Sequence, residues 1–129
     1  MARKVTHEDL DKLLNLMNRT GNFKASLIST DQGLVISSAV STTTNEGTAA
    51  AMAPAIHATV TQVSQELGLG KIYDIVIRAE RGTLVLKSFR VDDQRFILTV
   101  IAPPLPPLNE VISEGVNRVR GILSKLGIT

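Results

Sequence analysis

One stretch near the C-terminus constrains the fold more than any other, because it is apolar on both faces. The run from 95 to 102 alternates its apolar residues between two faces, with Phe96, Leu98 and Val100 on one and Ile97 and Ile101 on the other. Successive side chains of a strand point to opposite sides, so such a strand must be covered on both sides. The sequence therefore predicts a sheet with a layer of helix on each face.

The remaining periodicities predict five strands and three helices. Strands are expected at 23–30, 34–40, 71–80, 83–90 and 95–102, and helices at 6–21, at 46–67 and in a final segment that ends near 126. Short turns at 31–33, 81–82 and 92–94 make neighbouring strands antiparallel. The order α-ββ-α-βββ-α predicts one domain over residues 1–129, a three-layer α/β/α sandwich with a five-stranded antiparallel sheet. The final helix has an apolar stripe made of Ile112, Val116, Val119, Leu123 and Leu126.

The middle helix carries the most distinctive pattern of the chain. An apolar seam repeats at gaps of four and three residues, through Ala49, Ala53, Ile56, Val60, Val63 and Leu67. Asn45 is a suitable N-cap, and Gly68 can end the helix in the left-handed conformation. Pro54 lies inside the span, where its ring predicts a kink.

A second face of the same helix carries small or polar residues, Ala51, Ala55, Ala58 and Gln62. Small side chains bury little area against the helix's own sheet, but they allow another backbone to approach closely. Two interpretations remain open. The face belongs either to a solvent-exposed helix of good propensity or to a dimer or partner interface.

The composition excludes several classes of function. The chain has no cysteine, so it has no disulfide, thiolate metal site or cysteine nucleophile. Its net charge of +2, with one tyrosine, three phenylalanines and no tryptophan, gives neither a basic footprint nor an aromatic platform for nucleic acid. The N-terminus lacks the apolar segment of a secretory signal, and no apolar run is long enough to span a membrane. A cytoplasmic protein without nucleic-acid partners is expected.

Catalytic patterns are also lacking. His7-Glu8 has no second histidine at zinc-ligand spacing, and 68–71 connects a helix to a strand, which is the reverse of a phosphate-binding loop. No catalytic residue, cofactor site or metal site is therefore predicted, and the chain is not expected to be an enzyme. One alternative remains, an enzyme or small-ligand sensor that uses His57 with Thr59 and Thr61 of the middle helix.

The element order and four segments resemble the Roadblock / dynein light chain family. These segments are the hairpin 27–36, the alanine-rich 48–58, the strand 82–86 and the strand 96–100. The resemblance implies a profilin-like fold and a homodimer or heterodimer. In that family the middle helices pack side by side, and the third strands pair into one continuous sheet. The Ile-rich third strand follows a long crossover, so it is free to be an edge, and pairing with its twin would protect that edge.

The resemblance also implies a function. Family members are regulators, GTPase-activating or scaffold proteins of small Ras-like GTPases, and some are light chains of motor complexes. The first hypothesis is a homodimer that binds such a GTPase through its paired middle helices. The alternative is a structural adaptor or light-chain subunit of a larger complex that is indifferent to nucleotide state. The expected interface comprises Ala51, Met52, Ala55, Ile56, Ala58, Thr59, Gln62, Ile72, Tyr73, Ile75 and Ile77.

Overall fold

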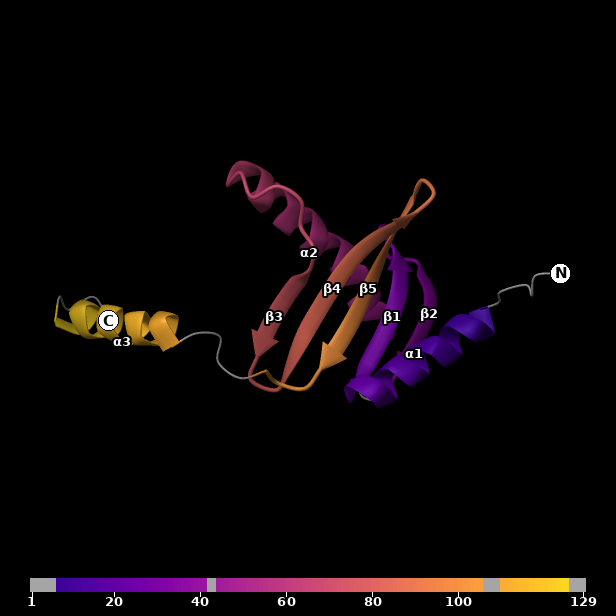
Figure 1. The fold of residues 1–129 in the computed structure, drawn as a ribbon, viewed down its shortest axis with the longest axis horizontal. Coiled ribbons are helices and arrows are strands. Elements are labelled where there is room, and N and C mark those ends of the chain that lie inside the picture. The colour runs from indigo at the N-terminus through magenta and orange to yellow at the C-terminus, as the bar shows by residue number, and fades with distance from the viewer. Residues whose placement is uncertain (1–6, 42–43, 106–109, 126–129) are drawn as a thin grey trace.

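The computed structural model describes residues 7–41, 44–105 and 110–125, which form three helices and five strands (Figure 1). In chain order these are α1 (His7–Gly21), β1 (Ala25–Thr30), β2 (Val35–Val40), α2 (Glu46–Glu66), β3 (Ile75–Ala79), β4 (Gly82–Val91), β5 (Gln94–Ala102) and α3 (Glu110–Lys125). The predicted element order is confirmed. The predicted first residue of the first helix, Thr6, and the last stripe residue, Leu126, lie outside the described residues.

The sheet has the strand order β2-β1-β5-β4-β3, and every neighbouring pair is antiparallel. The predicted five-stranded antiparallel sheet is therefore confirmed. The β1–β2 turn contains Gly33 at φ +89°, a conformation that favours glycine. A side chain there would also meet the carbonyl oxygen of Ala50 at 3.1 Å, so this turn packs closely on α2. The strands β2 and β3 are the two edges.

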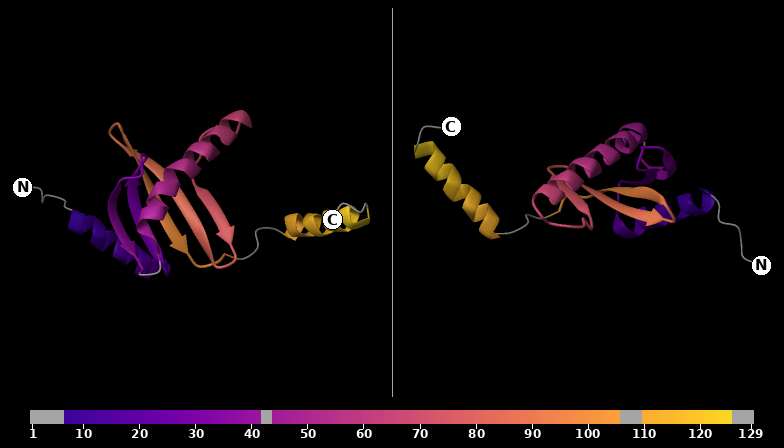
Figure 2. Two further views of the ribbon diagram at one scale, coloured as in Figure 1. Left: turned by 180° about the vertical axis from the view of Figure 1, so that it is seen from behind. Right: turned by 90° about the horizontal axis from the view of Figure 1, so that it is seen from above.

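Helices cover both faces of the sheet, as the apolar pattern of the last strand predicts (Figure 2). On one face α1 lies over β1 and β2, where Ser26 Oγ donates to the carbonyl oxygen of Leu14 at 3.5 Å. Asn18 Nδ2 of α1 donates to the carbonyl oxygen of Ala39 at 2.8 Å. On the other face α2 crosses the sheet obliquely and contacts four of its strands. The two outer layers of the sandwich are thus α1 and α2.

The main core lies between α2 and the sheet. It is formed by Ala53, Ile75, Leu86 and Ile97, all of them buried. The predicted seam of α2 enters this core only in part, because Val63 is 47% exposed and Leu67 is 67% exposed. Val60 still packs against the core, but the last turns of the helix extend past the start of β3 (Figure 2). The C-terminal end of the seam is therefore exposed.

Several predicted boundaries also differ from the structure. The third strand starts at Ile75 rather than Lys71, because its pairing with β4 begins at the Ile75–Leu86 pair. The first strand starts two residues later than predicted, at Ala25. The first helix does end at residue 21 as predicted, and Asn22 after it takes the left-handed conformation, with φ 56°. The helix α2 runs without interruption through Pro54.

The last helix, α3, forms where the sequence predicts it but lies apart from the sheet in all three views (Figures 1 and 2). Its stripe residues Val116 and Val119 are 50% and 55% exposed. The chain that leads toward it is held by Arg78, whose Nη2 donates to the carbonyl oxygen of Leu105 at 2.8 Å. The apolar stripe of α3 is therefore uncovered at its described positions.

Candidate partner-binding surface

The helix α2 is fixed at both ends by local interactions, which make its outer surface a defined platform. The side chain of Asn45 accepts from the backbone N–H of Thr48 at 2.9 Å, as expected of an N-cap. Glu46 accepts from Ser38 Oγ at 2.8 Å, which ties the first turn to β2. At the other end Gly68 takes φ +68°. The predicted cap and stop are both confirmed.

The outer face of α2 carries small side chains over its first turns. Ala51, Ala55 and Ala58 are exposed along this face, and Gln62 continues it. The polar groups nearby are turned back onto the helix: Thr59 Oγ1 donates to the carbonyl oxygen of Ala55 at 2.9 Å, and Gln62 Nε2 donates to Glu66 Oε1 at 3.2 Å. A second backbone can therefore approach this face closely.

One flank of α2 is apolar and faces β3 and β4. Met52 is 55% exposed, and Ile56 is half-buried and packs on the core. Both residues line a narrow hollow of about 80 Å³, whose floor includes Leu84 and Leu86 of β4. Val63, also exposed, continues the apolar flank beyond the sheet. This flank offers hydrophobic area next to the β3 edge.

The edge strand β3 and the segment before it hold the remaining residues of the expected interface. Tyr73 is 74% exposed and Ile77 is 40% exposed, so both can be reached from outside. Ile75 is only 8% exposed and belongs to the core of the protomer, while Ile72 packs against that core. The structure thus places Tyr73 and Ile77 at the edge together with the apolar flank of α2, and it places Ile75 beneath them.

The opposite flank of α2 is polar and faces the tip of the β4–β5 hairpin. His57 and Thr61 line an open hollow there, together with Asp31 and Arg95. The pKa of His57 is lowered, first by burial and then by the positive charge of Arg95, while Asp31 acts in the opposite direction. The sequence alone did not predict that these residues lie close together, because Arg95 is 38 positions from His57 and no known motif has that spacing.

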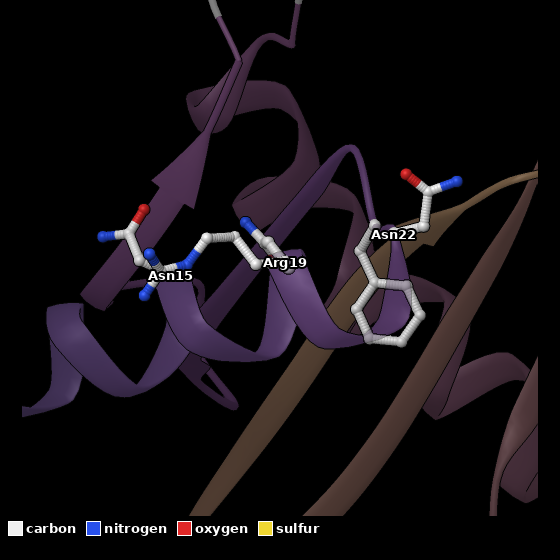
Figure 3. Close-up of a pocket in the computed structure, with 5 residues that line it drawn as sticks. Asn15, Arg19 and Asn22 are labelled. Atoms are coloured by element: carbon white, nitrogen blue, oxygen red, sulfur yellow. The ribbon is translucent and has the colours of Figure 1, made fainter.

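A third hollow lies at the end of α1 and has a volume of about 520 Å³. It is lined by Asn15, Asn18, Arg19, Asn22 and Phe23. Figure 3 shows Asn15 and Arg19 along one side of the helix and Asn22 beyond its end. The described neighbours include no carboxylate or histidine that would act with these amides, so this hollow suggests no reaction.

The described residues contain no group of three histidine, cysteine, aspartate or glutamate side chains placed to hold a metal ion. Among the helices that the structure describes, none is long and apolar enough to cross a membrane. The prominent surface features of the described residues are thus the outer face and two flanks of α2 and the adjoining β3 edge.

Comparison with solved structures finds known proteins that share this architecture. The Myxococcus xanthus protein MglB superposes with a TM-score of 0.67 at 17% identity, covering 98% of this chain and 96% of MglB. The gliding protein MglB from Thermus thermophilus gives 0.65 at 16% identity, covering 91% and 87%. A Roadblock/LC7 domain from Streptomyces avermitilis gives 0.62 at 17% identity, covering 72% and 77%. These likenesses show the fold.

At the level of sequence, no curated protein matches the chain significantly. The sequence model of the Roadblock/LC7 domain, however, matches residues 9–102, which is more than half of the chain and spans α1 through β5. The resemblance seen in the sequence is therefore confirmed, and the chain belongs to the Roadblock/LC7 domain family.

Proposed function

We propose that the protein is a non-catalytic, dimeric regulator or scaffold that binds a small Ras-like GTPase through its paired middle helices. Membership of the Roadblock/LC7 domain family supports a regulatory or adaptor role. A protein of this kind needs no reacting groups of its own. It acts by binding one conformation of the GTPase more tightly than another and so shifts the balance between them.

The observation that carries the proposal is the contrast between the outer face and the apolar flank of α2. Ala51, Ala55 and Ala58 leave the outer face flat, while Met52 and the rest of the apolar flank lie beside a free strand edge. A lone protomer gains nothing by exposing apolar groups there. In a dimer the flank and the edge are covered together, and the flat face remains open to a partner.

The β3 edge supports self-association specifically. Among the described residues β3 pairs with β4 alone, so the backbone groups on its outer side have no strand partner there. Pairing with the β3 strand of a second copy extends the sheet across a two-fold axis, which is the isologous arrangement that closes an edge most simply. Tyr73 and Ile77 then lie at the junction, next to the apolar flank of α2.

The test is recovery of a GTPase from lysate of the source cells by the purified protein, with GDP and with a non-hydrolysable GTP analogue. Wild type is expected to enrich a small GTPase in one nucleotide state. Ala55→Arg and Ala58→Glu are expected to lose at least about nine tenths of this binding, because a long charged side chain blocks close approach at the centre of an interface. Thr20→Arg, which places the charge of Ala55→Arg at an exposed position of α1, is the matched control for that variant.

Circular dichroism must show that all three variants remain folded. Retention of the GTPase by both α2 variants would contradict the proposal. Recovery of a large multi-subunit complex, in equal amounts in both nucleotide states, would instead assign the protein as a structural adaptor or light-chain subunit.

A further inference from the structure

A polar trough separates α2 from the β4–β5 hairpin. Two open hollows, of about 740 Å³ and 660 Å³, adjoin there and share His57, Thr61, Gln65 and Arg95. They are continuous because α2 crosses the sheet obliquely, so its C-terminal half diverges from the tip of the hairpin (Figure 2). The segment that follows α2 closes one end, where Lys71 lines the wall.

The trough carries more positive than negative charge, three basic side chains against the two carboxylates of Asp31 and Glu66. Arg90 and Arg95 lie directly opposite each other on β4 and β5, and Lys71 faces the same space. In the part of the chain that the structure describes, none of these three residues forms an ion pair. The two carboxylates that line the trough already accept hydrogen bonds, Asp31 from Gln94 Nε2 at 3.4 Å and Glu66 from Gln62 Nε2 at 3.2 Å.

Such an arrangement costs stability in the isolated protein. Like charges directly opposite on adjacent antiparallel strands repel each other. One of the pair is also held in place, since Arg95 Nη1 donates to Ser88 Oγ at 3.3 Å. A guanidinium presents a planar fork of donors that matches a carboxylate, so an anion bound between the two arginines would remove the repulsion and satisfy the free donors.

The shape of the trough favours an extended ligand. His57 and Gln65 stand eight residues apart on one wall, which is about 12 Å along the helix. About four residues of an extended chain cover that length, at roughly 3.3 Å each. The trough offers a nucleobase little to stack on. Phe89 is the one phenylalanine, tyrosine or tryptophan that lines it, and its ring is stacked on that of Phe96, with 5.7 Å between the ring centroids.

We propose that this trough binds an extended acidic segment of a protein partner, whose carboxylates are held by Arg90 and Arg95. Lys71 flanks the two arginines and extends the positive surface along the segment. The site adjoins the outer face of α2, since Ala58 and Gln62 also line the trough, and it lies on the opposite side of the helix from the apolar flank. It depends neither on dimer formation nor on the partner being a GTPase.

The test uses the full chain, labelled with ¹⁵N, and a ten-residue peptide in which glutamate alternates with serine. We expect the amide resonances of Thr61, Gln65, Arg90 and Arg95 to shift on titration at low salt. A peptide with glutamine in place of every glutamate is expected to cause no shift. The double variant Arg90→Glu/Arg95→Glu is expected to weaken binding by at least about tenfold.

The matched control is Arg81→Glu/Lys87→Glu, which reverses two exposed charges on β4 and its preceding turn. The uncharged variant Arg90→Gln/Arg95→Gln keeps the test valid if the charge-reversed protein does not fold. Equal weakening by the control, or shifts spread over other basic surfaces, would overturn the proposal. Shifts of the trough residues with GDP or inorganic phosphate, but not with the acidic peptide, would overturn it in favour of a small phosphate-bearing ligand.

Discussion

Short hydroxyl-bearing residues form part of the layer on which α2 rests. Ser29 and Thr99 are buried in the adjacent strands β1 and β5, 0% and 2% exposed, and within the described structure neither hydroxyl has a hydrogen-bond partner. Their small size lets α2 approach the sheet through Ala53. The unpaired hydroxyl groups are the cost of that approach, because burying a polar group without a partner opposes folding.

This cost can be measured at Thr99. The change Thr99→Val keeps the shape and removes the unpaired hydroxyl, so we expect the free energy of unfolding to rise by about 1 kcal/mol. Thr83→Val is the matched control, since Thr83 is equally buried but its Oγ1 donates to the carbonyl oxygen of Pro103 at 3.0 Å. It is expected to lower the free energy of unfolding by about the same amount. Urea unfolding measures both, and a loss of stability in Thr99→Val would show that its hydroxyl is bonded.

His57 makes stability depend on pH. Its pKa in the folded protein is lowered below the ordinary 6.5, mainly by burial and then by Arg95, with Asp31 opposing. Between the folded pKa and 6.5 the unfolded chain binds more protons, so the free energy of unfolding falls as the pH decreases through this window. Stability is therefore complete above the ordinary value and reduced below the folded one. Arg90, Lys71 and Glu66 complete the charged groups that line the trough facing His57.

We expect the melting temperature of wild type to drop more steeply than that of His57→Gln between about pH 7.5 and 5.5, the range in which histidine titrates. His7→Gln, at the other histidine of the chain, is the control and is expected to follow wild type. The same slope in wild type and His57→Gln would contradict a lowered pKa.

At the scale of elements, the sequence predicts what depends on neighbours along the chain. The N-cap at Asn45, the left-handed Gly68 and the turn at Gly33 follow from local backbone requirements, and all three are present. The element order follows from hydrophobic periodicity and short turns, so it too could be predicted. A free β3 edge followed from the long crossover that precedes this strand.

What the sequence did not predict depends on register and on where one element ends relative to another. The apolar seam of α2 reaches Leu67, but its last residues are exposed because the end of the helix extends beyond the sheet. Arg90 and Arg95 form a pair only through the antiparallel register of β4 and β5. Their distance from His57 is set by the oblique crossing of α2, which no periodicity encodes. The polar trough was therefore not predicted, and the outer face of α2 stays a predicted interface.

At the scale of the whole molecule, two of the exposed apolar surfaces in the described structure differ in what adjoins them. One is the stripe of α3 at Val116 and Val119, which lies away from the sheet. The other is the apolar flank of α2 with Ile77 beside it, at the free edge of β3. Only the second combines hydrophobic area with unpaired backbone groups. It is therefore the place where a second copy gains most, from burial and strand pairing at once.

Self-association at this edge predicts a dimer, and the molecular mass in solution tests this prediction. We expect wild type to sediment at twice the chain mass of 13.9 kDa. Met52→Lys is expected to raise the dimer dissociation constant by about tenfold or more, because losing the burial of one methionine costs about 1.5–3 kcal/mol and 1.4 kcal/mol is a factor of ten.

Leu16→Lys on α1 is the matched control, because Leu16 is 51% exposed and Met52 is 55% exposed, and both lie on helices. It is expected to leave the dissociation constant unchanged, since α1 covers the opposite face of the sheet, away from the β3 edge. If both variants raised the dissociation constant equally, the dimer contact would not lie on α2. A wild-type protein that stays monomeric at all concentrations would rule out self-pairing of β3, and the apolar flank would then be left for a different protein to cover.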